Sequence, residues 1–172
     1  MVLTTHAVFG GFLGGLAQVN PVFSFVLGFL SHFALDAIPH WDYPLGSSTK
    51  NKTEDPLKGD FIIGKEFLFD LIKIGTDFLL GIIVVFLYIY KGDILHPQSF
   101  LVSNIFWGAL GGMVPDFLQF VYYKLKREPL TTLQRFHLFM HTNVRLADWH
   151  IVGPLLQIVL IVSVIWVYPF FF

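Results

Sequence analysis

The sequence lacks cysteine and has few charged residues. None of its 172 residues is Cys, and Asp, Glu, Lys and Arg together make up only 13% of the chain. The absence of cysteine excludes a disulfide framework, a thiolate nucleophile and a Cys-based zinc site. Any metal must therefore be bound by His and carboxylate side chains.

The chain also lacks an excess of charge of either sign. Its formal net charge is −1, and it has no stripe of Lys and Arg to replace the counterions of a nucleic acid. We therefore expect no nucleic-acid partner. Hydrophobic residues make up 55% of the sequence, above the roughly 45–50% of soluble domains. This composition predicts one integral membrane domain, residues 1–172, whose main partner is the lipid bilayer.

Apolar segments alternate with two polar regions. The segments 4–19, 22–37, 61–90, 100–123 and 151–172 predict an all-α membrane bundle with about five crossings. The first is shorter than the roughly 20 residues that a full crossing needs. Residues 44–58 lack periodicity and apolar surface, which predicts a mobile loop. Residues 124–150 read as an amphipathic cytoplasmic segment.

The basic residues give this bundle an orientation. Five crossings place the 38–64 loop and the 124–150 segment on one side of the membrane and the 91–98 loop on the other. The positive-inside rule makes the first side cytoplasmic in a bacterial-type inner or plasma membrane. Its basic residues are Lys50, Lys52, Lys58, Lys124, Lys126, Arg127, Arg135 and Arg145, whereas the far side has only Lys91.

A cluster of possible metal ligands ends the second apolar segment. His32 and Asp36 are four residues apart, which places them on one face of a helix. Pro39 ends that helix, so that His40 and Asp42 lie on an irregular segment able to fold back over it. Polar groups at the end of an apolar helix are costly unless they are paired. The pattern favours a metal site over simple pairing of these side chains.

Further candidates lie near the cytoplasmic ends of other segments. His6 lies in the first segment, and Asp116 follows Pro115 in the fourth. His137 and His141 have the i,i+4 spacing that lets two imidazoles chelate one ion. The spacing from Gly28 to Asp36 recurs from Gly108 to Asp116, which hints at a weak internal repeat. The predicted ligands are His6, His32, Asp36, His40, Asp116, His137 and His141.

Three short motifs resemble a known family. Thr5-His6-Ala7-Val8-Phe9-Gly10, Pro115-Asp116 and His141-Thr142 are similar to motifs of the inner-membrane-associated metal-dependent hydrolases, a family likened to zinc-dependent phospholipase C. The resemblance implies a helical membrane bundle with a His/Asp metal site at His6, Asp116, His137 and His141. This chain has Phe117 and Leu118 where family members often carry Asp and His.

These observations favour a hydrolase that faces the cytoplasm. One or two divalent ions, with Zn²⁺ favoured over Mn²⁺, Mg²⁺ or Fe²⁺, would activate water against a phosphoester or related ester of a membrane-associated small molecule or lipid. Asp42 or Glu66 would be the general base. Arg135 or Arg145 would neutralise developing phosphate charge.

Two other functions fit the same residues. A non-catalytic divalent-metal-binding or ion-transport protein would line an ion path with Asp70, Asp77 and Asp116, although Lys73 at helical spacing can pair with Asp70 or Asp77. A haem held by two histidines, His6 and His32, is the other alternative.

Overall fold

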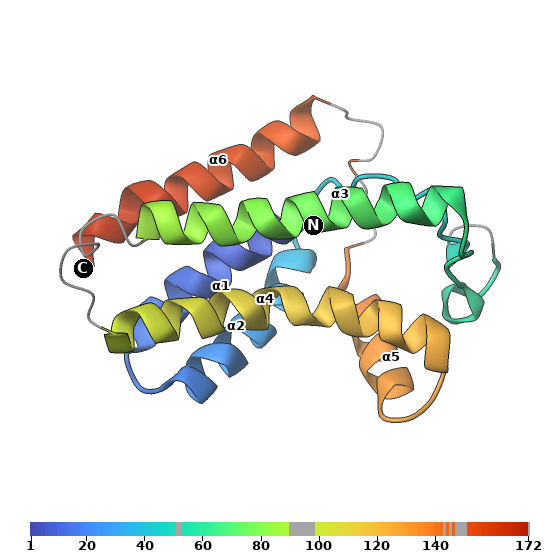
Figure 1. The fold of residues 1–172 in the computed structure, drawn as a ribbon, viewed down its shortest axis with the longest axis horizontal. Helices are drawn as coiled ribbons and strands as arrows, with labels where there is room; N and C mark the ends of the chain where they lie inside the picture. The colour runs from blue at the N-terminus through green and yellow to red at the C-terminus, as the bar shows by residue number, and fades with distance from the viewer. Residues whose placement is uncertain (51–52, 90–98, 143, 145, 147–150, 172) are drawn as a thin grey trace.

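The computed structural model describes residues 1–50, 53–89, 99–142, 144, 146 and 151–171. These residues form six α-helices and no strand, so the all-α prediction is confirmed. The helices are α1 (Leu3–Ala17), α2 (Pro21–Asp36), α3 (Lys65–Val84), α4 (Ser99–Leu125), α5 (Leu130–Met140) and α6 (Val152–Val167) (Figure 1). A π-helical segment, Val85–Ile89, continues α3, and 3₁₀ turns occupy Pro56–Lys58 and Tyr168–Phe170.

Glycines bring α1, α2 and α4 into backbone contact. A Cβ atom added to Gly10 or Gly28 would collide with the carbonyl oxygen of Gly108, and one added to Gly112 would collide with the carbonyl oxygen of His6. Small residues at such positions let helix backbones approach closely. The two glycines of the predicted repeat, Gly28 and Gly108, therefore pack against each other. This three-helix unit fixes the depths at which α1, α2 and α4 present their polar residues.

The other long helices pack around this unit. Helices α3 and α6 both contact α1. Gly81 of α3 lies against Thr4 and Ala7 of α1. The buried apolar core is shared by α1, α4, the π-helical segment and the end of the chain: Leu3, Ala7, Val8, Val85, Ile105, Ala109, Met113, Val164 and Tyr168.

The membrane prediction holds only in part. Among the described residues, two helices are long and apolar enough to cross a bilayer, Phe100–Leu125 and Val152–Phe170. Helices α1 and α2 are shorter, and the first half of α3 carries charged side chains. The five-crossing arrangement therefore stays a prediction.

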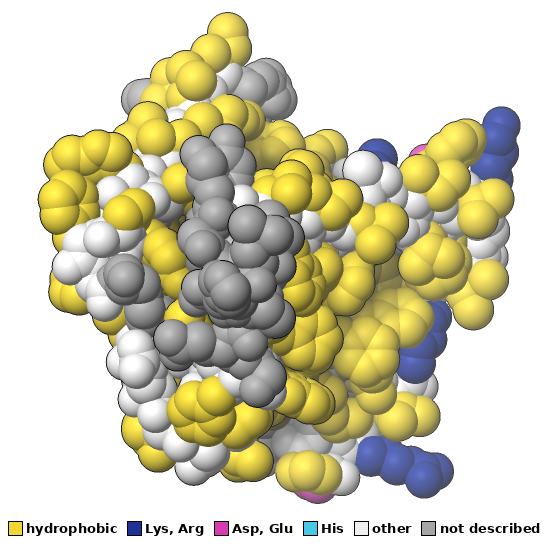
Figure 2. Space-filling model, turned by 60° about the vertical axis from the view of Figure 1, so that its left-hand side comes forward, with side chains coloured by type: hydrophobic (Ala, Val, Ile, Leu, Met, Phe, Trp, Pro, Cys, Tyr) yellow, Lys and Arg dark blue, Asp and Glu magenta, His cyan; other side chains and the backbone are white. Residues whose placement is uncertain are grey.

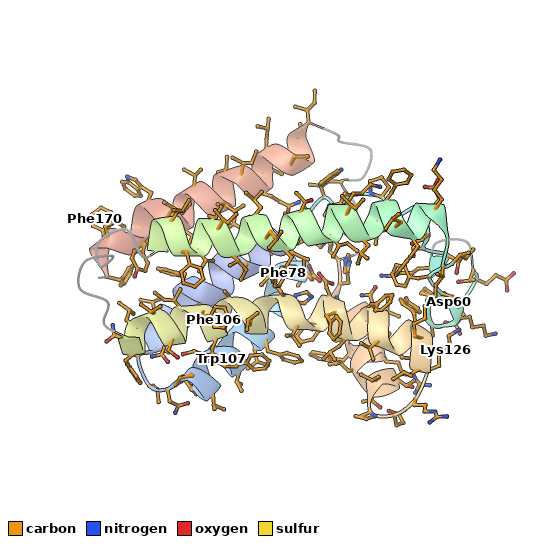
Figure 3. All side chains as sticks on the ribbon, in the orientation of Figure 1. Asp60, Phe78, Phe106, Trp107, Lys126 and Phe170 are labelled. Carbon is orange, nitrogen blue, oxygen red and sulfur yellow. The ribbon has the colours of Figure 1, made fainter. Side chains whose placement is uncertain are left out.

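Charged side chains are unevenly distributed over the surface. Hydrophobic side chains cover most of the face in Figure 2, and the Lys and Arg side chains gather toward one edge. In Figure 3, Asp60 and Lys126 lie at one end of the molecule and Phe170 at the other. The Lys and Arg side chains of this face thus lie toward one end of the long axis, whereas exposed apolar side chains occur along its whole length.

The described residues of the predicted mobile loop are well anchored. Tyr122 and Tyr123 of α4 each donate their hydroxyl to a loop carbonyl at 3.1 Å, those of Leu57 and Pro56 respectively. Ser47 is buried. These contacts hold the described part of the loop against α4. The mobility of the loop stays a prediction.

Candidate metal centre

Asp36, the last residue of α2, lies at the centre of a cluster of histidines. Its side chain is 1% exposed. The Nε2 atoms of His137, His32, His6 and His40 lie 3.1, 3.2, 3.3 and 3.7 Å from its carboxylate oxygens. Four segments of the chain, α1, α2, α5 and the irregular segment after Pro39, therefore converge on one carboxylate.

The cluster contains two groups of side chains with metal-ligand geometry. The first comprises His32, Asp36, Asp116 and His137, and the second comprises Asp36, His40 and His141. Within each group, one ligand atom per residue lies within 4.8 Å of the others. Asp36 belongs to both groups. The arrangement would therefore hold one ion or two.

Backbone hydrogen bonds fix the tautomers of three histidines. His32 Nδ1 lies 2.8 Å from the carbonyl oxygen of Gly112, and His40 Nδ1 lies 2.8 Å from that of Ile38. A carbonyl oxygen can only accept, so each Nδ1 carries the proton and each neutral ring presents a lone pair at Nε2. His141 repeats the pattern with the carbonyl of Thr142 at 3.2 Å. Metal-binding histidines commonly hold their second nitrogen in this way.

These Nε2 lone pairs face carboxylate oxygens, which are also acceptors. His32 Nε2 lies between Asp36 at 3.2 Å and Asp116 at 3.7 Å, and His40 Nε2 lies 3.4 Å from Asp42. Among the described residues, Nε2 of His40 has no hydrogen-bond partner. Acceptors that face one another at this range in a buried site repel unless a cation lies between them.

Protonation of both rings of a neighbouring pair would not resolve this conflict. The rings of His6 and His32 are stacked with their centroids 3.9 Å apart, and those of His40 and His141 are 4.8 Å apart. Imidazolium ions at these separations would repel one another strongly. A divalent cation satisfies several lone pairs and carboxylates together, so the residues fit a metal better than they fit extra protons.

A positive group already approaches the carboxylates. The α-ammonium of Met1 lies 3.1 Å from Asp36 and 2.6 Å from Asp42. It donates to these two carboxylates, and among the described residues Nε2 of His40 still has no hydrogen-bond partner. Burial by itself would raise the pKa of Asp42, but the Met1 ammonium beside it helps to hold that pKa well below its usual range. Asp42 is therefore ionised, with its side chain half exposed.

His137 has a partner that sequence reasoning did not identify. Its Nδ1 lies 3.3 Å from the Gln119 side-chain nitrogen. A half-turn of the amide would place the oxygen there, so that Nδ1 donates and Nε2 is free for a metal. Burial lowers the pKa of His137, which favours the neutral form that binds metals. Gln119 follows Asp116 by three residues, and this helical spacing is the signal that could have identified it.

All seven predicted metal ligands and Asp42 lie in this cluster, but the other predicted catalytic residues do not. Arg135 is exposed, because the inward face of α5 is the one that buries Gln134 and His137. Glu66 lies beside Gly46 and, unlike Asp70 one turn later, is not among the described residues that line the cavity at the cluster. Arg145 is outside the described residues. The roles predicted for Glu66 and Arg135 are therefore not supported by their positions.

Asp70 and Asp77, the two acidic residues of α3 that were predicted to line an ion path, have structural partners. Asp70 accepts from the backbone and hydroxyl of Ser47 at 2.8 and 2.7 Å and from Lys73 at 3.2 Å, which is the predicted pairing. Asp77 accepts from the backbone N–H groups of Leu3 and Thr4 at 2.7 and 3.1 Å and so caps the first turn of α1. Donors from the protein therefore satisfy both carboxylates.

A cavity of about 780 Å³ adjoins the cluster. The residues that line it from the cluster include Asp36, His40, Asp42, Asp116, His137 and His141, and those from the loop include Ser47, Ser48 and Lys50. A substrate in this cavity would reach the proposed ligands directly.

No protein-family model, curated protein or solved structure matches this chain. The geometry of the Asp36 cluster is therefore the basis for the proposed function.

Proposed function

We propose that this protein is a membrane-embedded, metal-dependent hydrolase that cleaves a phosphoester or related ester of a membrane-associated substrate. The observation that carries the proposal is the ring of imidazole Nε2 lone pairs around the buried carboxylate of Asp36. One or two divalent ions would be held there by His32, Asp36, Asp116 and His137 and by Asp36, His40 and His141, with His6 stacked on His32. Zn²⁺ suits a site of imidazoles and carboxylates without thiolates.

The chemistry divides between the ion and Asp42. A bound divalent ion would lower the pKa of a coordinated water toward about 7 and polarise the ester oxygen. Asp42 is ionised and half exposed beside His40 and His141, where it can accept the proton of the attacking water. His32, His40 and His141 keep their orientation through Nδ1–H bonds to backbone carbonyls.

The surroundings of the cluster support the membrane assignment. Two helices have the length and composition of membrane spans, and Lys and Arg gather at one end of the molecule. Five crossings with that end in the cytoplasm would explain both features. The resemblance to inner-membrane metal-dependent hydrolases agrees, because its matching positions, His6, Asp116, His137 and His141, all lie in or beside the cluster.

The other two functions fit less well. A transport path needs acidic groups that are free to bind ions along it, but donors from the protein satisfy Asp70 and Asp77. A haem between His6 and His32 would need space for a porphyrin, and these rings are in contact at 3.9 Å.

Metal analysis of detergent-purified protein tests the proposal. We expect stoichiometric divalent metal in the wild type and its loss in His32→Ala and His141→Ala, and the matched control His96→Ala should keep its metal. Metal-loaded wild type should hydrolyse bis-p-nitrophenyl phosphate or p-nitrophenyl butyrate. Equal metal in all variants would overturn the shared site, and a metal-loaded protein inactive on both esters would contradict the hydrolase assignment.

The orientation can be tested separately by cysteine labelling, because the chain has no cysteine of its own. Single cysteines at Ser48 and Thr132 should both be labelled from the cytoplasmic side, and a cysteine at Ser99 from the other side. Opposite accessibility of the first two positions would exclude the five-crossing arrangement.

A further inference from the structure

The cavity beside the metal centre extends between α3 and α4. Apart from the cluster, Asp70 and the loop residues Ser47, Ser48 and Lys50, its walls are mostly aliphatic and aromatic side chains. Helix α3 contributes Phe67, Leu71, Ile74 and Phe78, and α4 contributes Leu110, Met113, Val114, Phe117 and Phe120. Phe78 lies between the two helices in Figure 3. The cavity therefore has a polar end at Asp36 and an apolar body.

The mouth of this cavity is apolar as well. Leu71, Phe78 and Phe117 line the cavity and are also 53%, 36% and 63% exposed. They mark where the space between α3 and α4 reaches the surface. The neighbouring surface of α3 exposes further large apolar side chains, Leu68, Ile72 and Leu79. Such a mouth opens favourably to hydrocarbon and unfavourably to water.

The size and polarity of the cavity narrow the choice of occupant. Its volume of about 780 Å³ lies within the roughly 300–1,000 Å³ of small-molecule sites. A small polar ester would leave the apolar walls from Phe67 to Phe78 without contacts. An amphiphile with one hydrocarbon chain would cover these walls and place its polar linkage among Asp36, Asp116 and His137.

We propose that the space between α3 and α4 binds the hydrocarbon chain of a membrane lipid, which enters sideways from the bilayer and presents its phosphoester or ester linkage to the metal centre. This inference rests on the proposed function for the reacting group and on the cavity for the chain. It makes the substrate class an amphiphile with a long alkyl or acyl chain.

Gly75 offers a way to fill the cavity without disturbing the fold. It lies on α3, lines the cavity, and a Cβ atom there would meet no heavy atom within 4 Å. Gly75→Phe should therefore project a ring into the space that the chain occupies. Gly64→Phe is the matched control, because Gly64 is equally open but lies just before α3 and is not among the described residues that line the cavity.

Binding of two non-hydrolysable phosphonates to metal-loaded protein in nanodiscs tests the proposal. Wild type and Gly64→Phe should bind hexadecylphosphonate at least about tenfold more tightly than methylphosphonate, a difference of about 1.4 kcal/mol. Gly75→Phe should remove that preference and leave methylphosphonate binding and metal content unchanged. Gly75→Leu should give an intermediate loss, and it replaces the Phe variant if that variant lacks native helix content.

The outcomes separate this inference from the proposed function. Equal affinity of wild type for the two phosphonates, or an undiminished chain preference in the folded Gly75 variants, would overturn the chain site while the metal content still supports the hydrolase. Absence of metal with a chain preference that Gly75→Phe removes would overturn the metal centre and support the cavity as a chain site.

Discussion

Asp36 and Asp70 are both buried carboxylates, but their surroundings are opposite in character. Their side chains are 1% and 2% exposed. Asp70 is surrounded by donors: the N–H groups of Gly46 and Ser47, the Ser47 hydroxyl and the Lys73 ammonium. Asp36 has one ammonium donor, that of Met1 at 3.1 Å, and is otherwise surrounded by imidazole nitrogens, of which those of His32 and His40 present lone pairs. Burial alone therefore does not distinguish a candidate metal ligand from a structural carboxylate; the partners of the two carboxylates differ.

The largest expected difference between the two sites is in metal content. Asp36→Asn should abolish stoichiometric metal, because Asp36 belongs to both groups of ligands. Asp70→Asn should retain the metal, because Asp70 already has its full set of donors. Elemental analysis of the two purified variants checks this prediction. If both variants lose metal, or neither does, the contrast between the sites is wrong.

A smaller effect is expected at Asp42, and it should appear in the rate. Asp42→Asn removes the proposed base but leaves the ligands of the first group in place. We expect metal to be retained and kcat to fall by about 10²–10⁴-fold, the usual contribution of general base catalysis. Turnover of whichever model ester the wild type cleaves provides the measurement. An Asp42→Asn enzyme with wild-type kcat would show that another group takes the proton.

Gln119 should have an intermediate effect on metal affinity. Its amide lies 3.3 Å from His137 Nδ1 and holds that ring toward Asp36. Loss of such a supporting hydrogen bond typically weakens metal binding by about 10–100-fold. Gln119→Ala should show this loss in a competition assay with a chelator. Gln119→Glu, which can still accept from Nδ1–H, should restore most of the affinity, whereas a purely packing role would predict no rescue.

The smallest effect concerns stability in the absence of metal. Asp70→Ala leaves the buried donors of Ser47 without an acceptor, which should lower the free energy of unfolding by about 1–3 kcal/mol. Asp36→Ala should cost less under the same conditions, because it also removes the repulsion between a carboxylate and imidazole lone pairs. Denaturation of both variants in the presence of EDTA compares them. A larger loss for Asp36→Ala would show that Asp36 is the more important structural group.

Local spacing determined the parts of the site that lie on one element. The i,i+4 pair His32 and Asp36 shares a helix face because of the α-helical period, and Pro39 ends that helix so that His40 returns to Asp36. The apolar segments predicted the positions of α1, α2, α3, α4 and α6 for the same reason. The predicted ligands were expected at one end of the bundle because five crossings place all of them near the cytoplasmic ends of their segments.

Only the tertiary structure decided which of these residues lie together. Arg135 and Glu66 have suitable chemistry, but helix rotation exposes the first and the path of the loop leaves the second beside Gly46. Asp70 and Asp77 resemble Asp36 in sequence context, and only contacts with distant residues show that donors satisfy them. The space between α3 and α4 likewise depends on how both helices pack on α1. Sequence periodicity fixes the face of a helix, but lone-pair directions and partners across the bundle depend on packing between segments far apart in the chain.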